Sequence, residues 1–146
     1  MLFSTIAQIG FIALVLVTGF ALIVGRRWAR LSAILHAVNW IAVSLLQDRS
    51  GPNVFQWSNL TVDVVGAVLA VWLAVASRRS WAAWIAAFQL LGVANRIVAP
   101  LVLSHRTTVT TSYVWEAGAL LAIVVGAIMQ RREPSPRHRS PAQPER

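Results

Sequence analysis

Residues 3–25 read FSTIAQIGFIALVLVTGFALIVG, and no side chain in this stretch carries a charge. A transmembrane α-helix needs about 20 mainly apolar residues, because each residue rises only about 1.5 Å through a hydrocarbon layer about 30 Å thick. A cleaved secretory signal places its positive charge before a shorter apolar run, whereas Arg26 and Arg27 follow this one. The stretch therefore predicts a retained membrane-spanning helix.

Four more stretches of the chain have the length and composition of a membrane span. The predicted spans are residues 3–25, 31–47, 60–77, 81–103 and 112–130. The predicted fold class is all-α, a polytopic bundle of five transmembrane helices within residues 1–130. Residues 131–146 contain four prolines and almost nothing apolar, so we predict a disordered basic tail there.

The composition agrees with a membrane protein. Hydrophobic residues make up 57% of the chain and charged residues 12%, against about 45–50% and about 25% in soluble domains. A formal charge of +8 would suggest nucleic acid if it lined one folded face, but these arginines lie between apolar segments and in the tail. We therefore expect the lipid bilayer as the main partner, and no nucleic acid.

The arginines are divided unevenly between the two sides of the predicted bundle. One side would hold Arg26, Arg27, Arg30, Arg78, Arg79, Arg131, Arg132, Arg137, Arg139 and Arg146, and the other side Arg49 and Arg106. Cytoplasmic loops retain an excess of basic residues. We therefore expect the N-terminus outside and the C-terminal tail in the cytoplasm, in a bacterial inner membrane.

Three residues with a formal charge fall inside predicted spans, where a charge costs about 2.5–3.5 kcal/mol on insertion scales. They are Asp63, Arg96 and Glu116. With the predicted topology all three lie near the outer ends of their helices and can meet at one depth. A salt-bridge clip between the helices is one interpretation of this cluster, and an outward-facing binding or proton-exchange site is the other.

The second predicted span carries a polar stripe. Ser32, His36, Asn39 and Gln47 share one helical face, and Val43 interrupts it. Gln89 in the fourth span lies at a similar depth to Asn39 and on the same face as Arg96. The stripe would either form hydrogen bonds between helices or line an aqueous path, which the apolar interruption disfavours.

None of the residue spacings that mark a known catalytic or cofactor site is present in the sequence. The chain has no cysteine, and His105 and His138 lie outside the predicted spans, so His36 would need a second chain to complete a haem or metal site. No phosphate-binding, metalloprotease or nucleophile-elbow motif is present. We expect no metal, no cofactor and no catalytic residues.

One resemblance can be drawn from the run SRRSWAAWIAAFQLL at residues 77–91. It is preceded by LLQDRS and followed by a last span that opens with SYVWE. In these segments the chain resembles small multi-pass membrane proteins of alphaproteobacteria, a group to which no activity is attached. The resemblance implies a fold and a membrane location only.

The first functional hypothesis is a noncatalytic accessory or interaction subunit, whose polar faces hold helices or partners together. The alternative is a small oligomeric transporter or channel that uses the outer-facing Asp63, Arg96 and Glu116 cluster and the interrupted stripe. A membrane enzyme ranks third. The partners expected beyond lipid are further copies of the chain or a larger membrane complex.

Overall fold

The computed structural model describes residues 5–46, 57–102 and 105–132, and within these ranges every element is an α-helix. The helices are α1 (Thr5–Val24), α2 (Arg27–Leu46), α3 (Trp57–Ser77), α4 (Ser80–Val102) and α5 (His105–Arg132). The prediction of an all-α chain with five long helices is confirmed. Gln47 and the tail from residue 133 onward lie outside the described residues.

The helices have the length and surface of membrane spans. All five are long and apolar enough to cross a bilayer. On α2 one apolar face is exposed at Ile34, Val38, Ile41 and Leu45. Side chains such as Ile23 and Leu45 are 82% and 79% exposed, which a lipid environment tolerates and water does not. The chain is therefore built as an integral membrane protein.

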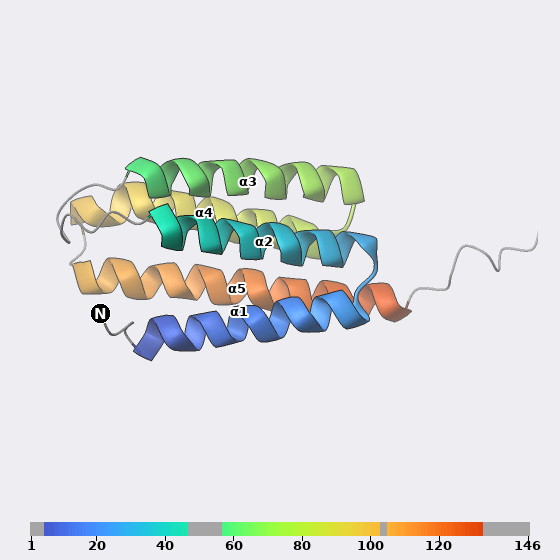
Figure 1. The fold of residues 1–146 in the computed structure, drawn as a ribbon. Coiled ribbons are helices and arrows are strands. Elements are labelled where there is room, and N and C mark those ends of the chain that lie inside the picture. The colour runs from blue at the N-terminus through green and yellow to red at the C-terminus, as the bar shows by residue number, and fades with distance from the viewer. Residues whose placement is uncertain (1–4, 47–56, 103–104, 133–146) are drawn as a thin grey trace, which may run out of the picture.

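The five helices run side by side (Figure 1), and their contacts close them into a ring. Each helix packs against the next one in the chain, and α5 closes the ring against α1. A further contact between α2 and α5 crosses the ring, so that α2, α3, α4 and α5 surround an interior of their own. We call the end where α3 turns into α4 the arginine-rich end, because Arg26, Arg27, Arg78, Arg79 and Arg132 lie there.

Three helices begin three or more residues earlier than the apolar stretches predict. α2 begins at Arg27 instead of residue 31, α3 at Trp57 instead of 60, and α5 at His105 instead of 112. Hydropathy detects only the part of a helix inside the hydrocarbon, whereas a bilayer with its headgroups is about 40–45 Å thick. Polar turns at the helix ends fit that outer layer and continue the backbone hydrogen bonding.

Short turns at the arginine-rich end make neighbours of successive helices. Gly25 ends α1, and a Cβ atom there would lie 2.9 Å from that of Ala29, so only glycine fits the turn. Arg78 links α3 to α4 in the left-handed region, with a φ of 52°. The backbone N–H of Ala29 in the first turn of α2 donates to Gln130 Oε1 of α5 at 3.2 Å, which caps α2 from across the bundle.

Small residues on α5 receive the large side chains of α4. Gly118, Ala122 and Gly126 recur every four residues, a spacing that predicts close helix approach. A Cβ atom at Gly118 would meet the ring of Phe88 at 2.5 Å, and one at Gly126 would meet the ring of Trp81 at 2.5 Å. This packing fixes the rotation of α4 against α5, which in turn points Gln89 and Arg96 at the interior.

Candidate functional site: a buried polar centre between four helices

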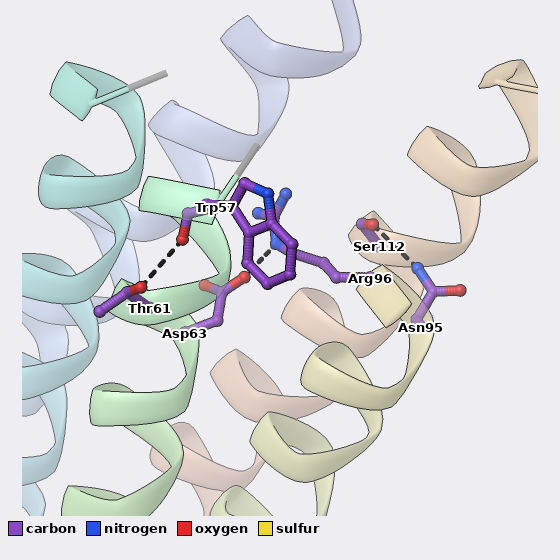
Figure 2. Close-up of polar contacts among 6 residues, drawn as sticks. All are labelled: Trp57, Thr61, Asp63, Asn95, Arg96 and Ser112. Atoms are coloured by element: carbon purple, nitrogen blue, oxygen red, sulfur yellow. Dashed lines mark hydrogen bonds and ion pairs between the residues drawn. The ribbon is translucent and has the colours of Figure 1, made fainter. Parts of the chain in front are cut away.

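An ion pair joins α3 to α4. The Nε group of Arg96 donates to Oδ2 of Asp63, and Figure 2 shows the arginine reaching across the interhelical space to the carboxylate. Only 12% of the Asp63 side chain is exposed, against 31% for Arg96. The guanidinium thus keeps part of its surface outside the protein while its Nε group binds the buried acid.

A second polar chain joins α4, α2 and α5 through His36. The amide Nε2 of Gln89 lies 2.9 Å from His36 Nδ1, and the other ring nitrogen, Nε2, lies 2.9 Å from Glu116 Oε2. The His36 side chain is only 3% exposed. The Nε2 and Oε2 atoms are close enough for an ion pair, but they are not aligned as a hydrogen bond.

The direction of the contact with Gln89 depends on the tautomer of His36. With Gln89 Nε2 toward the ring, the amide donates and His36 Nδ1 accepts. With a proton on Nδ1, the Gln89 amide would turn its oxygen toward the ring and accept.

The structure rearranges one part of the predicted cluster. Asp63, Arg96 and Glu116 do line the same cavity, which has a volume of about 30 Å³ and space for about one water molecule. Among the described residues Arg96 forms an ion pair with Asp63, whereas Glu116 contacts His36. The three side chains thus belong to two adjacent pairs, because α5 also contacts α2 across the ring.

The polar stripe on α2 faces the protein interior. Ser32, His36 and Asn39 are all buried, and the Ser32 hydroxyl donates to the carbonyl of Trp28 in its own helix at 2.9 Å. Asn39 packs over Gly66 of α3 and forms a side-chain hydrogen bond with Asp63. The stripe therefore connects the Asp63 pair to the His36 pair. Gln89, predicted to meet this face, does so at His36.

Sequence reasoning did not select a further polar set on α4 and α5. The amide of Asn95 donates through Nδ2 to the Ser112 hydroxyl at 3.0 Å (Figure 2), and its Oδ1 accepts from Thr111 at 2.9 Å. The sequence could have indicated this set through Asn95, whose amide side chain stands next to Arg96 in an otherwise apolar span. Trp115, also unselected, lines the small cavity, and its buried indole N–H has no hydrogen-bond partner among the described residues.

A larger cavity lies on the other side of His36 and Gln89, between α2 and α3. It has a volume of about 280 Å³, and we call it the α2–α3 groove. Its walls are mainly apolar, whereas Ser32, His36, Asn39 and Gln89 supply polar groups. Gln89 lines both the groove and the small cavity. His36 and Gln89 thus form the partition between two cavities of different character.

Opposite charges meet at the ion pair of Asp63 and Arg96. Asp63 is also near enough to Glu116 for the two carboxylates to interact electrostatically. The centre therefore brings two acids, one guanidinium and one imidazole together inside the bundle.

The described residues contain no group of three or more His, Cys, Asp or Glu side chains placed to hold a metal ion. Comparisons of the chain with protein-family models, curated proteins and solved structures find no match. The resemblance to alphaproteobacterial membrane proteins accordingly remains a prediction from sequence.

Proposed function

We propose that this chain is a small, noncatalytic, proton-linked transporter, with Glu116 as its proton-binding group and His36 as the buried residue in contact with it. The observation that carries the proposal is the buried contact between His36 Nε2 and Glu116 Oε2. Ionisable side chains inside a membrane are costly, and where they persist in pairs they often form proton relays or substrate paths.

The inward direction of the polar residues supports transport over an accessory role. An accessory subunit that binds partners through its polar faces would present them at the lipid surface. Here Asn39, His36 and Gln89 are each no more than 9% exposed, and they contact groups of the same chain. The polar groups thus serve an internal centre, and the surface around α2 is apolar.

The accessory subunit stays the second candidate because of the size of the charged cavity. At about 30 Å³ it holds about one water molecule and no larger solute. A transporter must therefore open this region in another conformation, for which a second copy of the chain could supply the missing walls. We propose a homo-oligomer on this ground.

We also propose the orientation that the arginines favour. Arg26, Arg27, Arg78, Arg79 and Arg132 lie at one end of the bundle, and an excess of basic residues marks the cytoplasmic side. In a bacterial inner membrane the small cavity, which lies toward the other end, would then face the periplasmic half of the bilayer.

Water access to the small cavity tests the transport proposal. Gly92 lines this cavity, and a Cβ atom there meets nothing within 4 Å, so Gly92→Cys should fold. Gly19 on α1 is equally open but lines neither cavity, which makes Gly19→Cys the matched control. The natural chain has no cysteine to interfere.

The two variants are placed in membrane vesicles and treated with a membrane-impermeant maleimide. Transport predicts that the cysteine at position 92 is labelled, because thiols react with this reagent only where water reaches them, and that the cysteine at position 19 is protected. Protection at both positions would contradict the transporter and favour the accessory subunit.

A further inference from the structure

We infer that the α2–α3 groove is the substrate site of the proposed transporter, and that its substrate is a neutral, lipid-soluble ring molecule carrying a carbonyl or hydroxyl group. That the bound molecule is a transported substrate rests on the proposed function. That the groove binds such a molecule rests on the geometry of the groove alone.

The groove opens sideways toward lipid. Three of its lining residues, Val38, Val65 and Leu69, are also exposed on the outer surface of the bundle, at 57%, 53% and 39%. Other walls are apolar, among them Leu35 and Leu73. A molecule dissolved in the bilayer can therefore reach the groove without crossing water, and an ion or a sugar cannot.

The size of the groove limits the apolar body of the ligand. An apolar cavity of about 150 Å³ holds one benzene molecule. The groove, at about 280 Å³, is close to the lower end of the range of small-molecule sites, about 300–1,000 Å³. Two fused rings, or one ring with a short substituent, fill this volume. A longer tail can extend through the opening of the groove into lipid.

The polar residues of the groove favour a ligand whose polar end, its head, forms hydrogen bonds and carries no charge. His36, Asn39 and Gln89 are buried and converge on the groove from α2 and α4. One hydrogen bond between Asn39 and Asp63 uses only part of the capacity of the amide, which has two donors and an acceptor. None of the residues lining the groove is Asp, Glu or Arg, so nothing there compensates an ionic head.

Gln89 joins the groove to the small cavity, because its side chain lines both. Its Nε2 group contacts His36 Nδ1, so a ligand in the groove meets the remaining hydrogen-bonding capacity of the same amide.

Equilibrium binding of naphthoquinone tests the groove, with naphthalene as the matched probe that lacks carbonyls. The protein is held in lipid nanodiscs, and empty nanodiscs correct for partition into lipid. The chain contains neither Cys nor Lys, so side-chain thiol and amine addition to the quinone cannot mimic binding. We expect saturable binding of naphthoquinone, at least about tenfold tighter than that of naphthalene, which corresponds to about one good hydrogen bond.

Two variants close the groove. Ala42→Phe fills the groove from the α2 wall. Val65→Phe narrows the groove at its opening, where the side chain is half exposed and no buried neighbour must move. Val68→Phe is the control, since Val68 is exposed on α3, the helix of Val65, but does not line the groove. Binding should weaken about tenfold or more in the first two variants and stay unchanged in the third.

Equal binding of the two probes, or equal binding by wild type and both groove variants, would overturn the inference. The result is independent of the maleimide test at Gly92, which uses no ligand. Labelled Gly92→Cys without naphthoquinone binding would reject this substrate class and retain the transporter. Binding with a protected Gly92→Cys would retain the site and reject transport.

Discussion

His36 and Glu116 meet across the ring of helices, with Nε2 and Oε2 2.9 Å apart, and Gln89 holds the opposite edge of the imidazole at the same distance. The histidine is thereby held between an amide on one side and an acid on the other. Gln89 also lines the α2–α3 groove, so the polar centre and the groove share this side chain.

Breaking the Asp63–Arg96 pair should destabilise the protein, and removing both charges should restore much of the loss. Arg96→Leu leaves the 12% exposed Asp63 carboxylate without its cation, at a cost of about 2 kcal/mol for a charged hydrogen bond. Asp63→Leu in the same chain removes the stranded acid. Thermal melting in detergent compares wild type, Arg96→Leu and the double variant.

Because Glu116 pairs with His36 and not with Arg96, adding Glu116→Leu to the double variant should lower stability again. If Arg96→Leu melts like wild type, the ion pair contributes nothing and the account of this contact is wrong. If adding Glu116→Leu instead raises the melting temperature, Glu116 is an unpaired acid and its contact with His36 does not stabilise the protein.

Two glycines of similar sequence context should respond oppositely to a methyl group. A Cβ atom at Gly66 overlaps the side chain of Asn39, whereas one at Gly92 meets nothing within 4 Å. Gly66→Ala should therefore cost about 1–3 kcal/mol as an overpacked interface, and Gly92→Ala should be neutral or stabilise by about 0.5–1 kcal/mol through helix propensity. Chemical denaturation in mixed micelles measures both, and equal effects would contradict the packing of α2 on α3.

The spans could be predicted from sequence because length and hydropathy are properties of each helix alone. Depth along the bilayer is also a local property, which is why Asp63 and Arg96 were expected to meet, and the structure joins them. The pairing of His36 with Glu116 depends on which helix faces which across the ring. No residue spacing encodes the contact of α2 with α5, so sequence reasoning did not predict that Glu116 meets His36.

The orientation of the bundle can be tested with fusions at both ends of α3. A cytoplasmic reporter fused after Arg79 or after Arg146 should be active, and a periplasmic reporter should be inactive at both positions, because the arginine-rich end is expected inside. A fusion after Gly51 should show the reverse pattern. Periplasmic activity after Arg146 would invert every loop and place the small cavity in the cytoplasmic half of the membrane.

The central claim is that Glu116 binds and releases a proton from water, and infrared difference spectroscopy of the protein in lipid tests it most directly. Spectra recorded on acidification, in ordinary and in heavy water, are compared for wild type and Glu116→Gln, which retains the shape of the side chain and removes its titration. The account predicts a carboxylic-acid carbonyl band that appears on acidification, shifts in heavy water and is absent from the variant. Identical spectra for the two proteins at every pH would show that Glu116 never exchanges a proton, and would contradict the account.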